Sequence, residues 1–299
     1  MSNRRIGIDL GGTKIEIAVL NEHNETVLRR RVPTPAGDYD RIVAAIVALV
    51  GQAEAEQGRA DGIGIGTPGM ASVESGLMKN ANSTALIGKP LQRDIEERLQ
   101  RSVRMTNDAN CFALSESVDG AATGAHTVFA VIAGTGIGGG IAIGGRILEG
   151  PNRIAGEWGH NPLPWPRENE RPGPACYCGK NGCIETYLSG PALAREYRTA
   201  SGSQAVPTEI AARAAQGDAV ALACMETYED RFARALATVI NILDPDAVVL
   251  GGGVSNIERL YERLPAILPA YVFSDSVRTR IVRAAHGDSS GVRGAAMLA

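Results

Sequence analysis

The sequence has few aromatic residues, no excess of basic charge and no long apolar run. Aromatic residues make up 4% of the 299 residues, whereas glycine occurs 36 times. This balance favours a ligand that is approached by backbone over one stacked between rings. The formal net charge of −3 offers no basic surface for nucleic acid. No stretch approaches the roughly 20 apolar residues that span a bilayer. We therefore expect neither nucleic acid nor a membrane as a partner.

Signals for secretion and for common nucleotide sites are also missing. The chain enters an apolar strand within a few residues of its start, so we expect a soluble, cytoplasmic protein. Lys89 and Lys180 lack the glycine spacing of a Walker A sequence. Gly134, Gly136 and Gly139 match the dinucleotide fingerprint, but the residues after them continue as a strand where that motif needs a helix. The sequence therefore predicts a hairpin here and no Rossmann site.

Cysteine is scarce and odd in number, with five in all, which is typical of a reducing compartment. Three thiolates from Cys176, Cys178 and Cys183, with the imidazole of His160, make the donor set of a closed structural zinc site. A disulfide plus a spare thiol is the weaker alternative, because Cys176 and Cys178 are poorly placed to bridge each other. Cys111 and Cys224 lie apart in helix-like segments and are expected to be small buried hydrophobes.

Two carboxylates, Glu157 and Glu185, flank this metal cluster in the sequence. A closed site leaves no open position for catalysis on the metal. Gly179 and Gly182 suit the tight turn that lets three sulfurs converge. The pattern predicts that zinc folds a loop and thereby aims the two carboxylates at a substrate.

Alternating strand and helix patterns organise the rest of the chain. Residues 4–32 predict a three-strand meander, and residues 38–58 a helix capped by Asp38 or Asp40. A long helix is expected over roughly 219–243. Residues 127–148 repeat the strand, glycine turn and strand of residues 6–20. We expect an α/β protein of two related domains, 1–117 and 118–289, with a C-terminal helix at about 290–299 that packs on the first.

Glycine-rich turns at 9–14, 134–140 and 251–253 are candidate phosphate sites. Backbone N–H groups at such turns can point at phosphate oxygens, and threonine hydroxyls add donors. One such turn is usually just a hairpin. Two in related halves, with Asp9 and Lys14 alongside, indicate a clamp for the phosphates and Mg²⁺ of a nucleotide.

Taken together, these motifs resemble the ROK family of sugar kinases. The resemblance rests on DLGGTK, NDAN at 107–110, GTGIGGG, ExGH at 157–160 and CxCGxxGCxE, and runs nearly end to end. NANST at 80–84, GEWGHNPLPW and CYCGKNGCIET are most similar to bacterial fructokinases and mannokinases, with N-acetylglucosamine kinases close behind. The resemblance implies an actin-like ATPase fold: two RNase H-like α/β domains, a zinc-bound loop, and a cleft where ATP and sugar meet.

The resemblance also assigns roles to residues. Asp108 would be the general base, although on sequence alone a helix N-cap is an equal alternative. Asp9 would reach Mg²⁺ through water. Lys14 could contact phosphate or be an ordinary exposed hairpin lysine. The sugar would be held by Asn82, Asn107, Glu157, His160 and Glu185, with His160 also ligating zinc. The nucleotide would be held by Gly11, Gly12, Thr13, Thr135, Gly136 and, beside adenosine, Gly252.

The expected activity is ATP-dependent phosphorylation of a hexose, D-fructose first and mannose second. The alternatives are an N-acetylglucosamine or glucose kinase, and a sugar-responsive regulator without catalysis. The regulator is disfavoured because the residues before the first strand leave no room for a helix-turn-helix. ATP, Mg²⁺ and structural Zn²⁺ are the expected cofactors, and a homodimer is implied by the resemblance. The segment 164–174 reads as a solvent loop near the pocket mouth.

Overall fold

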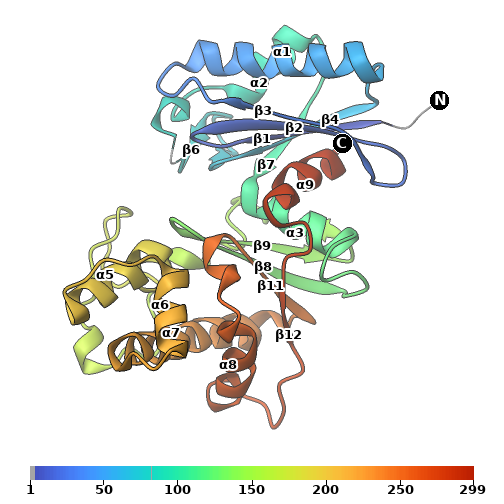
Figure 1. Cartoon of the computed structure of the whole chain (residues 1–299). Coiled ribbons are helices and arrows are strands. Elements are labelled where there is room, and N and C mark those ends of the chain that lie inside the picture. The colour runs from blue at the N-terminus through green and yellow to red at the C-terminus, as the bar shows by residue number, and fades with distance from the viewer. Residues whose placement is uncertain (1–3, 82) are drawn as a thin grey trace. The chain divides into compact units, whose positions relative to one another are not determined.

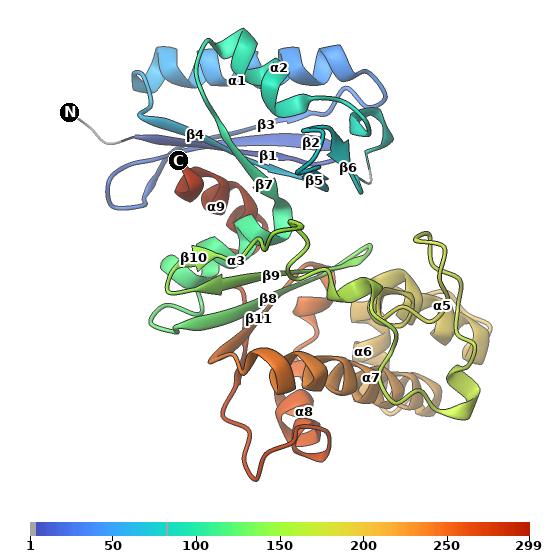
Figure 2. The ribbon, with the colours of Figure 1, turned by 180° about the vertical axis from the view of Figure 1, so that it is seen from behind.

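The computed structural model describes residues 4–81 and 83–299, which form two compact units. The first runs to Gly120 and takes in Gly145–Ala155 and Asp288–Ala299, and the second holds Ala121–Gly144 and Gly156–Gly287. Each unit is built around a mixed sheet of parallel and antiparallel strands with helices packed on it, so the predicted α/β class is confirmed (Figures 1 and 2). The units differ from the predicted domain bounds because residues 145–155 pack with the first unit, and the bounds themselves stay a prediction.

The sheet of the first unit has the strand order β3-β2-β1-β4-β7. β1 pairs antiparallel with β2 and parallel with β4, and β4 pairs parallel with β7. The apolar alternation of the first three strands produces the predicted meander. The strands are β1 (Arg5–Leu10), β2 (Lys14–Leu20), β3 (Thr26–Pro33), β4 (Gly62–Thr67) and β7 (Arg104–Asn107), with a small hairpin of β5 (Met70–Ala71) and β6 (Met78–Lys79).

The second sheet repeats this plan in the order β10-β9-β8-β11-β12. β8 pairs antiparallel with β9 from Thr127↔Ile143 to Ala133↔Ile137, and parallel with β11. The fingerprint-like glycines therefore lie in a hairpin, as predicted, and the internal repeat is real in three dimensions. The strands are β8 (Thr127–Ala133), β9 (Ile137–Ile143), β10 (Arg146–Ile147), β11 (Ala247–Gly251) and β12 (Arg280–Arg283).

Helices cover both faces of the first sheet. α1 (Tyr39–Gln57) and α2 (Leu91–Leu99) lie on one face, and α3 (Asp108–Val118) and α9 (Ser290–Leu298) on the other (Figures 1 and 2). Asp38 is the α1 cap, because its Oδ1 accepts the N–H of Arg41 at 3.1 Å. The buried residues of α1 keep helical spacing, as predicted.

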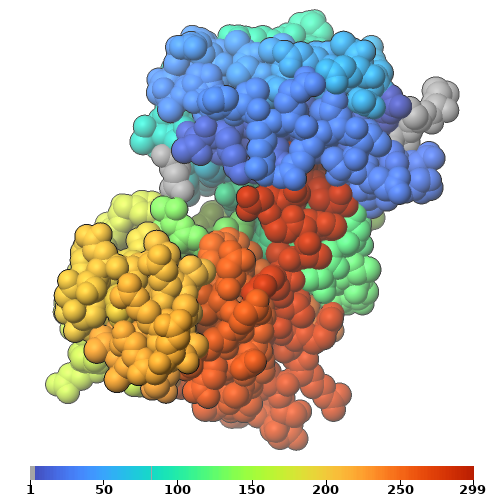
Figure 3. Space-filling model, viewed as in Figure 1, coloured from blue at the N-terminus to red at the C-terminus, as the bar shows by residue number. Residues whose placement is uncertain are grey.

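The C-terminal helix α9 approaches the sheet more closely than side chains would allow. A Cβ on Gly7 would lie 2.0 Å from the carbonyl oxygen of Val292, and one on Gly64 would lie 1.8 Å from that of Ala295. Only glycine fits at these strand positions. Figure 3 shows the red C-terminal residues against the blue N-terminal part. Segments near the two ends of the sequence thus pack closely against each other in the first unit.

The helices of the second unit lie mainly beside and beneath its sheet (Figure 1). The long helix α7 has the predicted bounds, Ala219–Leu243, and Asp218 caps it. Its buried face forms much of the core with residues of the sheet. The other helices are α4 (Glu185–Leu188), α5 (Gly190–Ser201), α6 (Pro207–Ala215) and α8 (Arg259–Ile267). Among the described residues, the search for a helix that could span a bilayer found none.

Candidate active site

The four predicted metal ligands come together in the second unit. The ligand atoms of His160, Cys176, Cys178 and Cys183 all lie within 4.8 Å of one another. The Cys176 Sγ to His160 Nδ1 distance is 3.5 Å, and the Cys178 and Cys183 sulfurs are 3.6 Å apart. A tetrahedral zinc ion holds its sulfur ligands about 3.8 Å apart and a sulfur and nitrogen pair about 3.6 Å apart. The donor set and its spacing therefore fit zinc.

Short backbone hydrogen bonds fold residues 176–183, the loop that carries the three predicted cysteine ligands (the metal loop). Cys176 N–H donates to the Lys180 carbonyl at 2.8 Å, and Gly179 N–H donates to the Cys176 carbonyl at 3.0 Å. Gly179 and Gly182 have φ angles of 87° and 70°, so both occupy the left-handed region that favours glycine. The prediction for these two turn glycines is confirmed.

The thiols crowd one another in a way that a cation would relieve. Burial and the neighbouring thiols raise the pKa of Cys183 to about 12, whereas the backbone N–H of Lys180 lowers the pKa of Cys178. One thiolate therefore disfavours the next. A bound divalent cation deprotonates coordinating thiols outright, which turns this crowding into ligation.

His160 presents two different ring nitrogens. Nδ1 faces the metal cluster, and Nε2 lies 2.9 Å from the Tyr177 hydroxyl, with the two rings edge to face at 5.0 Å. Sequence reasoning missed Tyr177, which stands between Cys176 and Cys178 in the predicted metal motif. Burial and the charges of Glu185 and Glu157 raise the pKa of Tyr177 to about 12, so both carboxylates act on this corner of the second unit.

The Glu157–His160 segment is pressed onto β9. Trp158 Nε1 donates to the Gly138 carbonyl at 3.2 Å. A Cβ on Gly159 would lie 2.2 Å from the Ile137 carbonyl oxygen, which explains the glycine in this motif. The predicted ligand His160 is thereby fixed relative to the β8–β9 hairpin.

Glu185 links the metal loop to the glycine hairpin. Its carboxylate accepts the backbone N–H of Ile137 at 3.0 Å, and a Cβ on Gly136 would lie 2.4 Å from the same oxygen. The Gly190 N–H, just beyond α4, donates to the Gly134 carbonyl at 2.8 Å. The β8–β9 turn is thus held from two sides by residues that follow the metal loop in sequence.

A cavity of about 620 Å³ opens beside this turn. Thr135 lines it, as does Gly253, the neighbour of the predicted Gly252. Gly252 has a φ of 80°, and a Cβ there would lie 2.4 Å from the Ala133 carbonyl oxygen. Sequence reasoning missed the helical side of the cavity, which comes from the starts of α5 and α6 and from the residues after β11: Gly190, Pro191, Ala194, Val206, Pro207, Thr208, Val254 and Asn256.

In the first unit, the β1–β2 turn carries the second predicted phosphate site. The Gly11 N–H donates to the Lys14 carbonyl at 2.9 Å, and Thr34 Oγ1 donates to the Gly11 carbonyl at 2.7 Å. Gly12 and Thr13 are exposed, and no atom would obstruct a Cβ on Gly12. The tip of this turn is open, so its backbone is available to a ligand.

Candidate acids gather at the carboxyl ends of the parallel strands. In the register of β1 with β4 and β4 with β7, Asp9 pairs with Gly66 and Thr67 pairs with Asn107, and Asp108 follows directly. Burial, followed by the charges of Asp108 and Glu16, raises the pKa of Asp9 to about 7. A cation beside Asp9 would lower this pKa again.

The neighbouring residue Asn107 decides which residue caps α3, one of the two roles considered for Asp108. Asn107 is the N-cap of α3, because its Oδ1 accepts the Asn110 N–H at 2.8 Å. Asp108 is the first residue of the helix and is exposed. The capping role therefore belongs to Asn107, a residue predicted only to bind sugar. Asn82, the remaining predicted sugar residue, lies outside the described residues.

The segment 164–174 is not the free solvent loop that the sequence suggested. Glu170 is buried, and Arg234 and Arg231 donate to its carboxylate at 2.7 Å each. Arg234 also donates to the Trp165 carbonyl at 2.8 Å. Both arginines lie on α7, so the correction has a long-range cause that alternating prolines and charges in the sequence could not reveal.

Known proteins share this architecture. The ROK family model matches residues 5–299. An N-acetyl-D-glucosamine kinase of Pectobacterium atrosepticum is 41% identical over 98% of this chain and 97% of its own. The solved ROK hexokinase from Thermus thermophilus superposes with a TM-score of 0.87 and 34% identity, covering 99% of this chain and 97% of that chain. A ROK family glucokinase from Streptomyces griseus, solved with glucose and AMPPNP, superposes with a TM-score of 0.80 and is 30% identical, with 99% of both chains covered.

These similarities extend over the entire sequence, so they bear on both units. The two sheets of equal topology form the actin-like ATPase fold that the resemblance implied. The chain therefore belongs to the ROK family, and the sugar kinases are the members of that family that it resembles.

Proposed function

We propose that the protein is an ATP-dependent hexose kinase whose preferred acceptor is N-acetyl-D-glucosamine. The observation that carries the proposal is the β8–β9 turn, whose Thr135 lines a cavity and whose Gly136 abuts a carboxylate of the metal loop. The identity to an N-acetyl-D-glucosamine kinase favours that sugar over fructose, the acceptor first expected from the motifs. Fructose, mannose and glucose remain as competitors to be tested.

Phosphoryl transfer leaves little covalent chemistry to the protein, so positioning and charge dominate. In the proposal, Asp108 accepts the proton of the attacking hydroxyl, and Asp9 holds Mg²⁺, which when bound neutralises charge on the phosphates. Backbone N–H groups of the two glycine turns and Lys14 hold phosphate oxygens. The cavity beside Thr135 takes the adenosine.

The sugar hydroxyls in this proposal are bound by Asn107, Glu157, His160 and Glu185, with Asn82 as a further partner. Zinc, when bound, would fix the loop that carries two of these groups and supply no open coordination position. Each sugar hydroxyl that meets a dedicated polar group adds discrimination, because an analogue lacking it leaves that group unpaired. A homodimer belongs to the proposal too, and light scattering would test it.

A hexose panel tests the function directly. ADP production is measured with ATP, Mg²⁺ and each of N-acetyl-D-glucosamine, fructose, mannose and glucose. We expect the highest kcat/KM for N-acetyl-D-glucosamine, and a kcat about 10³-fold lower for Asp108→Asn. Asp40→Asn, which changes an exposed aspartate of the same unit, should leave kcat unchanged. Sugar-independent ADP production, or full activity of Asp108→Asn, would contradict the proposal, and a higher kcat/KM for fructose would restore the first expectation.

A further inference from the structure

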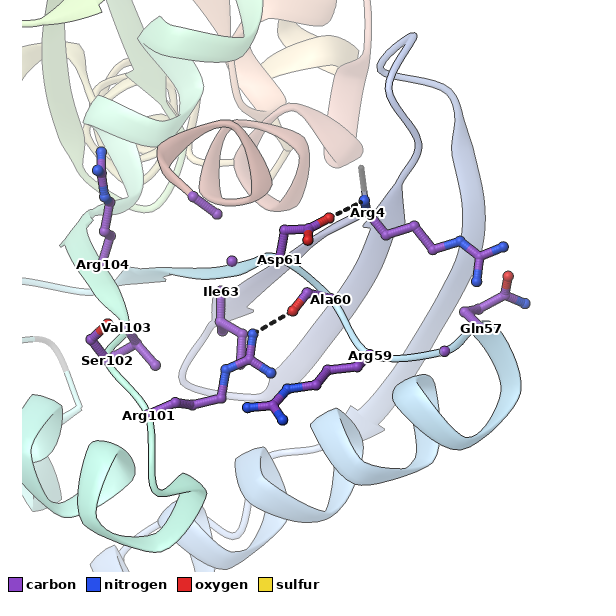
Figure 4. Close-up of a pocket in the computed structure, with 13 residues that line it drawn as sticks. Arg4, Gln57, Arg59, Ala60, Asp61, Ile63, Arg101, Ser102, Val103 and Arg104 are labelled. Atoms are coloured by element: carbon purple, nitrogen blue, oxygen red, sulfur yellow. Dashed lines mark hydrogen bonds between the residues drawn. The ribbon is translucent and has the colours of Figure 1, made fainter. Parts of the chain in front are cut away.

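The first unit contains a cavity of its own, which is separate from the proposed kinase site. It measures about 960 Å³ and is lined by the connections that precede β1, β4 and β7 (Figure 4). Four of its lining residues are arginines, Arg4, Arg59, Arg101 and Arg104, and Asp61 is its one acidic side chain among the described residues. The guanidinium groups of Arg59 and Arg101 come together in this hollow (Figure 4), and paired guanidinium groups are the usual chemistry for binding phosphate.

The cavity lies at the opposite edge of the sheet from the candidate catalytic acids. It includes Asp61 and Gly62 at the amino end of β4, whereas Asp9 and Asp108 belong to the carboxyl ends of β1 and β7. A six-residue strand such as β4 spans about 17 Å. A ligand in this cavity would therefore occupy a site distinct from the proposed phosphoryl-transfer centre.

Arg101 is held rigidly within the cavity wall. Its Nη1 donates to Glu54 at 2.6 Å and its Nη2 to the Ala60 carbonyl at 2.7 Å. Two of its five N–H donors are used in these bonds, which leaves three for a ligand. Because the guanidinium is already ordered, little conformational entropy remains to be lost when an anion binds.

Arg59 brings a second positive charge to Arg101 without a carboxylate of its own. Figure 4 shows the two side chains extending toward each other from opposite sides. Over residues 4–81 and 83–299, no hydrogen bond or ion pair is formed by the side chains of Arg4, Arg59 or Arg104. Glu54 and Asp61 offset two of the four positive charges, and the Asp61 carboxylate already accepts the Arg4 backbone N–H at 3.0 Å. A carboxylate at the end of Ala299, which also lines the cavity, would offset one more and still leave an excess of positive charge.

The size of the cavity and its other lining residues indicate what the rest of the ligand, beyond a phosphate group, is like. The volume exceeds what a phosphate ion needs and falls in the range of small-molecule sites. Ile63 and Val103 are buried apolar residues of the wall, and Gln57 and Ser102 offer polar groups. We propose that this cavity binds a phosphorylated small polar metabolite of the sugar phosphate class, with its phosphate between Arg59 and Arg101.

Calorimetric titration of the whole protein tests the proposal with two probes, N-acetyl-D-glucosamine 6-phosphate and inorganic phosphate. We expect Arg59→Gln to weaken sugar phosphate binding at least tenfold and Arg104→Gln about threefold. Arg41→Gln, an exposed arginine of α1 outside the cavity, is the matched control and should leave the affinity unchanged. Binding at the proposed kinase site is common to all these proteins, so the arginine-dependent part reports on this cavity whatever the catalytic activity proves to be.

Three outcomes would overturn the proposal. Affinity unaffected by Arg59→Gln would place the ligand elsewhere, and an equal loss in Arg41→Gln would reduce the effect to net charge. If inorganic phosphate bound as tightly as the sugar phosphate, the sugar part of the ligand would contribute nothing to binding. A melting curve of each variant without ligand checks folding, and we expect no change because Arg59 and Arg104 are exposed.

Discussion

The two glycine hairpins have similar sequences but very different surroundings. In the β1–β2 turn, Gly12 is exposed and has no neighbour near its Cβ position. In the β8–β9 turn, Gly136 abuts Glu185, and Gly134 accepts a bond from Gly190. One sequence motif thus yields an open turn and a clamped turn. The difference lies in the loop of predicted metal ligands, which has no counterpart among the described residues of the first unit and is followed by the clamping carboxylate of Glu185.

Removing the predicted metal should have the largest effect on the difference between the open β1–β2 turn and the clamped β8–β9 turn. Chelation or Cys178→Ser should unfold the loop, release Glu185 and raise the sugar KM by about tenfold. Hydrogen exchange should then accelerate at the Ile137 amide and stay unchanged at the Gly11 amide. Cys224→Ser, a cysteine outside the cluster, is the control. If the Ile137 amide kept its protection after proven metal loss, the clamp would not depend on the metal.

Substitution of Glu170, the buried carboxylate that precedes the metal loop in the sequence, should have the next largest effect. Glu170→Gln removes a buried charge that pairs with Arg234 and Arg231, and should lower the free energy of unfolding by about 3 kcal/mol at pH 7. Its arginine partners lower the pKa of Glu170 from 4.5 to about 2, against the effect of burial.

The sign of the pH effect follows from that lowered pKa. The stabilisation is complete above pH 4.5 and is lost as pH falls toward 2, so the wild type and Glu170→Gln should converge at low pH. Chemical denaturation of both proteins between pH 2 and 7 measures this. A difference that stays constant over the range would show that the charge is not its source.

A matched pair of alanine substitutions tests the two turns themselves. Gly136→Ala should displace Glu185 and cost about 1 to 2 kcal/mol of stability, because the Ile137 N–H loses its acceptor. Gly12→Ala should stay within about 0.5 kcal/mol, since space is open there. Thermal melting compares them, and equal losses would abolish the distinction between clamped and open turns.

The last prediction concerns the charge of Asp9, beside the open turn. Because the pKa of Asp9 is raised to about 7, its ionisation destabilises the fold as pH rises from about 4 through 7. Asp9→Asn should therefore be more stable than the wild type at pH 8 and about equally stable at pH 4. Denaturation without nucleotide or Mg²⁺ measures the difference, and a gain independent of pH would refute the assignment.

Local patterns in the sequence were enough for much of this molecule. Alternation predicted the meander, helical spacing predicted α7, and donor chemistry predicted the metal cluster. Residues whose partners lie far along the chain escaped prediction. Glu185 was predicted to bind sugar and also holds Ile137, and Glu170 was read as solvent-facing although it pairs with α7. Such bonds depend on tertiary packing, which spacing alone does not encode.

The seating of α9 on Gly7 and Gly64 has a consequence for biosynthesis. These strand residues are made early, whereas their covering helix, Ser290–Leu298, is translated only after the whole second unit. The part of the first sheet that α9 covers, around Gly7 and Gly64, must therefore stay uncovered while the second unit is synthesised. Contacts so distant along the chain slow folding and favour aggregation of the waiting intermediate. Nascent chains of this protein should need protection by chaperones until α9 leaves the ribosome.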